Sequence, residues 1–142
     1  MLVRLIYASR SVAAIDDRTM EAILAQSRRN NAETGVTGVL CACPGDVYLQ
    51  ALEGGREEVN RLYATVTRDG RHADVTLLEY AEIDQRRFAG WRMGKVDLNR
   101  VNAAVILKYA EQPRLDPYRI SGRTALRLLE ELIESASIVG GG

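Results

Sequence analysis

Alternating and clustered hydrophobic positions predict five β-strands along the chain. They are expected at residues 2–8, 36–43, 47–53, about 74–82 and from about 91 onward. In the first of these, Val3, Leu5 and Tyr7 share one face, because successive side chains of a strand point to opposite sides. The tripeptide Pro44-Gly45-Asp46 separates the second strand from the third and predicts the turn of a hairpin.

Apolar residues at helical spacing predict two helices between these strands. The first is expected to run from Asp16 or Asp17, either of which can cap it, to about Arg29. The second begins at Gly54-Gly55 and stops at Asp69-Gly70, where Gly70 suits the left-handed residue that follows a helix. The resulting order, βαββαββ, predicts an α+β fold with a ferredoxin-like sheet whose two helices lie on one face.

One polar residue, Gln50, interrupts the apolar third strand. Period-two alternation puts it on the same face as Tyr48 and Leu52. A buried amide without a partner costs roughly 1–3 kcal/mol, so a polar neighbour is expected. Because the first and third strands are central neighbours in a ferredoxin-like sheet, Tyr7 is the predicted partner.

Residues 99–142 are predicted to form a helical extension in the same globule as residues 1–98. Residues 101–109 are expected to be a short helix, although their apolar run also fits a strand. A longer helix is expected from Ser121 to about Ser137. Its apolar residues are at positions 125, 126, 128, 129, 132, 133 and 136. This stripe is wider than the ~100° needed to dock on one surface, so we expect one side to pack on the open face of the sheet and the remainder to contact another subunit or a partner.

Composition narrows the function classes. The chain has 142 residues, which suits one domain, and its 19 basic residues match 19 acidic ones, so no basic excess favours a nucleic-acid partner. The N-terminal sequence MLVRLIYASR is too short and too charged for a secretory signal, and no stretch approaches a membrane span. A cytoplasmic protein with no membrane partner is therefore expected. Cys41 and Cys43 lie too close along one strand face for a good disulfide, and with a single histidine no metal site is expected.

Several short motifs occur together in the order and spacing of a known family. They are Tyr7-Ala8-Ser9, Asn30-Asn31 followed by Thr37-Gly38, Leu49-Gln50-Ala51-Leu52-Glu53-Gly54, Asp69-Gly70-Arg71-His72, Arg87-Phe88 and Trp91-Arg92-Met93-Gly94. In combination they resemble the BLUF domain, a flavin-binding blue-light receptor, over residues 2 to about 97. Asp116-Pro117-Tyr118 and the Leu-rich helix after it resemble the short, stand-alone members of that family.

The resemblance implies a flavin between the two helices: FAD, with FMN or riboflavin as alternatives. Asn31 would bind the pyrimidine edge of the ring, and Gln50 would bridge between the flavin and Tyr7. Trp91 and Met93, expected on one face of the fifth strand, would flank the glutamine. The remaining candidate cofactor-binding residues are Ser9, Ile23, Ser27, Asn30, Tyr48, Leu52 and Val66, with Asp69, Arg71 and His72 near the ribityl chain and phosphate end.

By this resemblance the chain is a light sensor and not an enzyme. An excited flavin would take an electron and then a proton from Tyr7. Gln50 would relay the proton, since an amide both donates and accepts, and would be left rotated or tautomerised. The output would be altered contact with an unknown downstream protein or within a homo-oligomer.

Two other functions remain open at this stage. One is an acylphosphatase-like enzyme that uses Asn31 with Arg28 or Arg71, although the loop after the first strand lacks a glycine-rich phosphate cradle. The other is a module that binds flavin or forms oligomers without photochemistry.

Overall fold

The computed structural model describes residues 1–135 and 137–140. Its elements follow one another as β1 (Leu2–Ser11), α1 (Asp17–Thr34), β2 (Thr37–Cys43), β3 (Val47–Gly55), α2 (Arg56–Arg68), β4 (His72–Ile83), β5 (Gly94–Asp97), α3 (Ala103–Leu107), the 3₁₀ turn η1 (Pro117–Arg119) and α4 (Gly122–Glu134). The strands form one sheet in the order β4-β1-β3-β2-β5. Strand β5 runs parallel to β2, and the other neighbours are antiparallel. The predicted ferredoxin-like α+β fold is confirmed.

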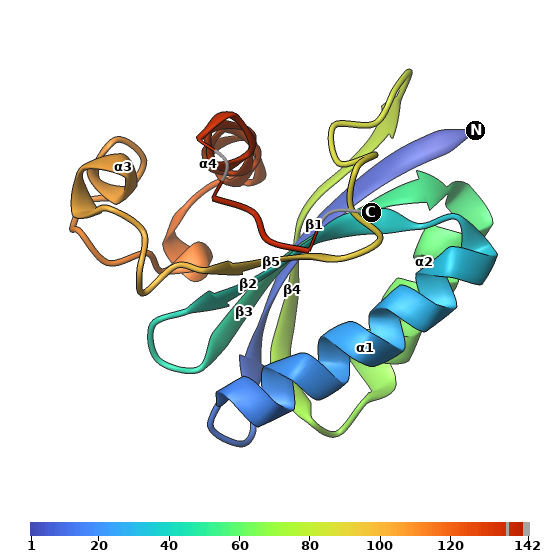
Figure 1. Ribbon diagram of the computed structural model, residues 1–142, viewed down its shortest axis with the longest axis horizontal. Coiled ribbons are helices and arrows are strands. Elements are labelled where there is room, and N and C mark those ends of the chain that lie inside the picture. The colour runs from blue at the N-terminus through green and yellow to red at the C-terminus, as the bar shows by residue number, and fades with distance from the viewer. Residues whose placement is uncertain (136, 141–142) are drawn as a thin grey trace.

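The sheet is covered on both faces, as Figure 1 shows. Helices α1 and α2 lie on one side, and α3 and α4 lie on the other. Each side has its own buried cluster. The cluster under α1 and α2 includes Leu5, Tyr7, Leu24, Tyr48, Leu52 and Met93. The cluster under α4 includes Ile6, Cys41, Leu49, Phe88, Leu128 and Leu132. Neighbouring residues of one strand thus belong to different cores, as the period of two requires.

Helix α1 is longer than its sequence pattern predicted. Asp16 caps it, accepting a hydrogen bond from the backbone N–H of Thr19 at 2.7 Å. The helix continues to Thr34 and ends at Gly35, which has a left-handed backbone with a φ of 78°. In this conformation the Gly35 N–H donates to the carbonyl of Asn31 and caps the helix. The expected end near Arg29 was wrong, so Asn31 lies inside the helix.

Two other local expectations were also wrong. Helix α2 is capped by Asp69 in an extended conformation, and Gly70 does not have the left-handed backbone predicted for it. The chain turns almost directly into β4, which leaves no room for a left-handed cap. Strand β5 begins at Gly94, so Trp91 and Met93 precede it and do not share a strand face. Met93 is buried in the cluster under α1 and α2, whereas Trp91 packs against the cluster under α4.

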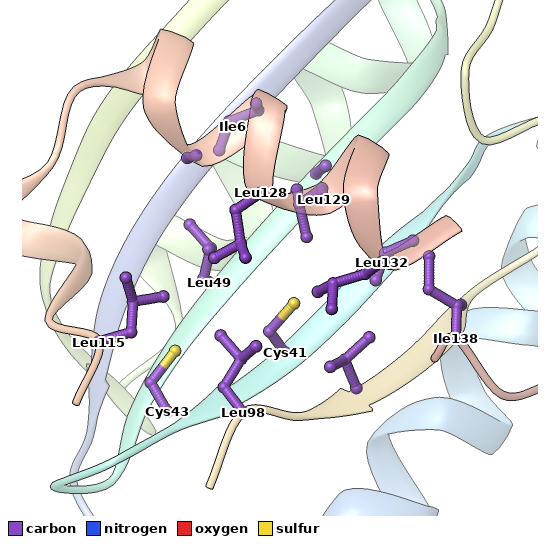
Figure 2. Close-up of a cluster of buried hydrophobic side chains, with 14 of the residues drawn as sticks. Ile6, Cys41, Cys43, Leu49, Leu98, Leu115, Leu128, Leu129, Leu132 and Ile138 are labelled. Carbon is purple, nitrogen blue, oxygen red and sulfur yellow. The ribbon is translucent and has the colours of Figure 1, made fainter. Parts of the chain in front are cut away.

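Helix α4 packs on the sheet as predicted. Ser121 caps it through Thr124, and Leu128, Leu129 and Leu132 point down onto β2 and β3 (Figure 2). It ends at Glu134 and not near residue 137. The stripe members at 126 and 133 are half-buried against the same cluster, so most of the wide stripe is used within the chain. Position 136 lies outside the described residues.

The two cysteines are buried in the cluster under α4 and form no disulfide, as predicted. Burial raises the pKa of Cys41 to about 12, which keeps its thiol protonated and unreactive. None of the helices within the described ranges has the length and apolarity needed to cross a membrane. Nor do the described residues place three or more His, Cys, Asp or Glu side chains together where they could hold a metal ion.

Replacing Leu128 by Ala should destabilise the fold by about 2–5 kcal/mol, because the fully buried side chain leaves a cavity between α4 and the sheet. Leu107→Ala is the matched control, since Leu107 is 50% exposed on α3. Urea denaturation measures both changes in the free energy of unfolding. Equal losses in the two variants would contradict the role of α4 as part of the core.

Candidate functional site

The centre of the candidate site is a hydrogen bond between the two central strands. Tyr7 of β1 and Gln50 of β3 are direct cross-strand partners in the ladder. The Tyr7 hydroxyl donates to Gln50 Oε1, and Gln50 Nε2 lies 3.4 Å from the sulfur of Met93. All three side chains are buried. The prediction that Tyr7 partners the buried amide is confirmed, and both ends of the amide have a neighbour.

The environment keeps the Tyr7 phenol protonated. Burial raises the pKa of Tyr7 far above its usual value of 10, and the nearby hydroxyls of Tyr63 and Tyr48 add to this effect. The ring of Tyr63 packs at a tilt against Tyr7, with 5.5 Å between centroids. Tyr7 is therefore protonated at neutral pH and donates its hydrogen bond to Gln50.

A cavity of about 600 Å³ opens beside this pair, between α1, α2 and the sheet. Most of the predicted flavin-site residues line it. These are Tyr7, Ile23, Ser27, Asn30, Asn31, Tyr48, Gln50, Val66, Asp69, Arg71 and His72. Its lining is mainly apolar with a few convergent polar groups, which is the usual character of a cofactor site.

Four predicted site residues lie outside the cavity lining. Ser9 sits behind His72, with 2.9 Å between its hydroxyl and Nδ1. Leu52 is buried in the apolar cluster, and Met93 lies behind Gln50. Trp91 packs on the opposite face of the sheet, so the prediction that it flanks Gln50 is wrong in this structure. The reason is that residues 91–93 approach β5 as an irregular segment, in which strand alternation does not apply.

Other lining residues were not predicted. They are Ser11, Val12, Ala13, Arg18, Thr19, Ala22, Gln26, Leu40, Leu62, Thr65 and Gly70. Helical spacing could have predicted three of them. Thr19, Ala22 and Gln26 lie on the same face of α1 as the predicted site residues Ile23 and Asn30.

Helix α1 also reaches across to the segment that carries Met93. The Asn31 side chain donates from Nδ2 to the carbonyl of Arg92. Arg28 Nε donates to the carbonyl of Met93 at 3.1 Å. The oxygen of the Asn31 amide is an acceptor, and the residue borders the cavity. The buried end of the cavity therefore presents two neutral amides, Asn31 and Gln50.

Charged groups gather at the exposed end of the cavity. Arg71 Nη2 pairs with Asp69 at 2.6 Å, and these bonds lower the pKa of Asp69 to about 2. The ring of His72 is tilted against Tyr48, with 5.6 Å between centroids. Burial lowers the pKa of His72, an effect that Asp69 opposes. The cavity thus changes from neutral amides at its buried end to ionised groups at its rim.

The sequence matches the family model described as BLUF, sensors of blue light using FAD, over residues 2–94. The chain belongs to the BLUF family. It is 33% identical over 85 residues to the photoactivated adenylate cyclase subunit beta of Euglena gracilis, an alignment that covers 60% of this chain and 10% of the cyclase subunit. The chain therefore spans only a small part of the length of the curated cyclase relatives it matches.

Solved BLUF proteins have the same fold along almost the entire chain. BlsA in its photo-activated state superimposes with a TM-score of 0.82 at 30% identity, covering 94% of this chain and 95% of BlsA. BlrB in its dark state gives 0.78 at 27% identity, covering 95% and 96%. This BLUF domain is a blue-light sensor that uses FAD. The comparisons favour this function over the acylphosphatase alternative.

The residues present fit the cofactor. The isoalloxazine ring has a flat apolar body and a pyrimidine edge that both donates and accepts hydrogen bonds. The cavity offers an apolar lining and two amides that can do the same. Its charged rim suits the polar end of the molecule.

Folding stability should depend on pH through His72. The folded protein disfavours the charged ring, whereas the unfolded chain protonates it near pH 6.5. Between these two pKa values the unfolded state binds more protons. Stability should therefore fall as the pH drops below about 6.5 and level off below the pKa of the folded state. Thermal unfolding between about pH 7.5 and 5 measures this, and His72→Gln should flatten the profile. If the stability of His72→Gln fell just as steeply with decreasing pH, groups other than His72 would be responsible for the pH dependence.

Proposed function

We propose that Tyr7 and Gln50 carry the light response of this BLUF domain. The observation that carries the proposal is the buried hydrogen bond from the Tyr7 hydroxyl to Gln50 Oε1 at the border of the cavity. When bound, FAD supplies the blue-light absorption and, once excited, an oxidant able to take an electron from a nearby phenol. The residues of the chain must then handle a proton, because an oxidised phenol is a strong acid.

The Tyr7–Gln50 bond provides the path for that proton. Tyr7 holds it in the dark, and Gln50 Oε1 is the acceptor that it meets. An amide also has donors on its nitrogen, so Gln50 can accept at one end and donate at the other. The relay leaves the glutamine rotated or tautomerised, which changes what Nε2 presents to Met93. The electron and the proton then return to Tyr7, and the glutamine stays rotated or tautomerised until it reverts in the dark.

Other residues of the cavity serve to bind the cofactor in this proposal. Asn31 bonds the pyrimidine edge, since its amide lies at the buried end beside Gln50. Ile23, Ser27 and Val66 contact the ring from the two helices. Asp69, Arg71 and His72 meet the ribityl and phosphate end, and Ser9 fixes His72 through its hydroxyl.

Tyr7→Phe and Gln50→Leu should each keep the flavin but lose the red shift of its absorption in blue light. The first removes the proton donor and the second removes the relay. Tyr63→Phe is the control, since it deletes a hydroxyl from the ring that packs on Tyr7 without touching that bond. Absorption spectra before and after illumination measure the shift. A normal shift in Gln50→Leu would refute the relay.

We further propose that residues 99–142 are the output region, which alters contact with a downstream protein or a second copy of the chain. Two residues that are close in the sequence support a connection between Gln50 and α4. Met93 contacts Gln50, and Trp91 packs against the cluster under α4. Arg87 adds an ion pair to Glu130 of α4 at 3.3 Å. A rearrangement at Gln50 therefore reaches the helix through a short, irregular segment.

Illumination should lower the hydrogen-exchange protection of α4. The expected change is at least about tenfold in its last two turns, since local opening is sensitive to the loss of a few packing contacts. Size-exclusion chromatography with light scattering, run in the dark and in blue light, reports any change of oligomer. Identical exchange across 122–134 in both conditions would place the output elsewhere.

A further inference from the structure

The segment after α4 returns to the sheet and pairs with the outer edge of β5. Lys95 N–H donates to the carbonyl of Val139 at 2.8 Å, and Val139 N–H donates to the carbonyl of Lys95 at 3.0 Å. Figure 1 shows this stretch, in red, leaving α4 and running beside β5. The pairing covers an edge that would otherwise present free backbone groups. It lies outside the residues matched by the family model.

Ile138 and Gly140, the residues on either side of Val139, make further contacts that hold this pairing in place. Ile138 is buried beside Leu132 and fills the space above Gly94, where an added Cβ would meet its Cγ2 at 2.5 Å. Gly140 lies against Arg28, because a Cβ at that position would clash with Nη2. With a φ of 92°, Gly140 has a backbone conformation that other residues rarely adopt.

Arg28 connects this segment to the photochemical centre. Its Nε donates to the carbonyl of Met93 at 3.1 Å, and the sulfur of Met93 accepts from Gln50 Nε2. Residues 93–95 are therefore held at three successive positions: Met93 by Arg28, Gly94 by Ile138 and Lys95 by Val139.

We propose that Arg28 and Ile138–Gly140 form a clamp that positions Met93 against Gln50 in the dark and sets the rate at which the light-adapted state returns. The inference rests on the proposed Tyr7–Gln50 relay. When Gln50 rearranges, Met93 loses its donor, and the clamp opens as residues 93–95 shift. The bonds of the clamp form again only when these residues regain their dark positions, so they help to drive the return. Arg28 and Val139 act as positioning residues through Met93.

Val139→Pro tests the clamp. Val139 is 65% exposed, and proline removes the N–H that bonds Lys95 while it also fixes φ at this position. Val139→Ala is the matched control, since it trims the same exposed side chain and keeps the N–H. Recovery of the flavin absorption in the dark should slow by at least about threefold in Val139→Pro and stay within about twofold of wild type in Val139→Ala.

Arg28→Gln provides a second, independent test. It removes the donor to Met93, whereas Arg29→Gln makes the same change at the exposed neighbouring position. Only the first should slow recovery, with the flavin content and the size of the light-induced shift unchanged. Unchanged or faster recovery in both Val139→Pro and Arg28→Gln would overturn the clamp. Absence of the shift in wild type would instead refute the relay, so the two failures are distinguishable.

Hydrogen exchange at the Lys95 amide tests the same proposal without any substitution. This N–H is bonded to Val139 in the clamped state. Its protection should fall at least about tenfold under continuous blue light. Equal protection in the dark and in the light, in wild type that shows the absorption shift, would overturn the opening of the clamp even if Val139→Pro failed to fold.

Discussion

The pairing of Tyr7 with Gln50 depends on the register between β1 and β3, and the rest of the site depends on that pairing. Because strand side chains alternate, a slip of one residue would turn Gln50 away from the cavity and into the core under α4. The β1–β3 ladder is continuous from Leu2 to Arg10. The irregularities of β1 occur on its other side, against β4, beside Tyr7 and Ala8. The ladder that places Tyr7 opposite Gln50 is thus free of these irregularities.

The segment between β4 and β5 joins the two cores of the molecule. Gly38 of β2 donates to its Trp91 carbonyl at 3.0 Å, and side chains make most of its other hydrogen bonds to the rest of the chain. Glu53 is fully buried, pairs with Arg4 and accepts hydrogen bonds from the N–H groups of Arg87 and Phe88. A buried carboxylate needs such partners to offset the loss of its hydration. Asn31 and Arg28 then hold the carbonyls of Arg92 and Met93. The segment thus depends on several separate contacts, so a change at one of them can shift it locally.

The distribution of charge along the cavity matches the chemistry proposed for it. The buried end holds a phenol and two amides, all neutral, so no desolvated charge distorts the proton path between Tyr7 and Gln50. Ionised groups appear only at the rim, where Asp69 and Arg71 satisfy each other in water. Neutral groups that both donate and accept can reverse their hydrogen bonds at low cost, which a switch requires.

Features that depend on local periodicity could be predicted from the order of the residues alone. Alternation and helical spacing predicted the strands, the two flanking helices and α4, and the ferredoxin-like order then predicted that Tyr7 meets Gln50. Features that depend on contacts between distant segments became visible only in the folded chain. The end of α1 at Gly35, the placement of Trp91 and Met93 in opposite cores, and the return of Ile138–Gly140 to β5 all belong to this group. Irregular backbone has no period, so its arrangement is set by partners that lie 44 or more residues away along the chain, such as Lys95 for Val139 or Arg28 for Met93.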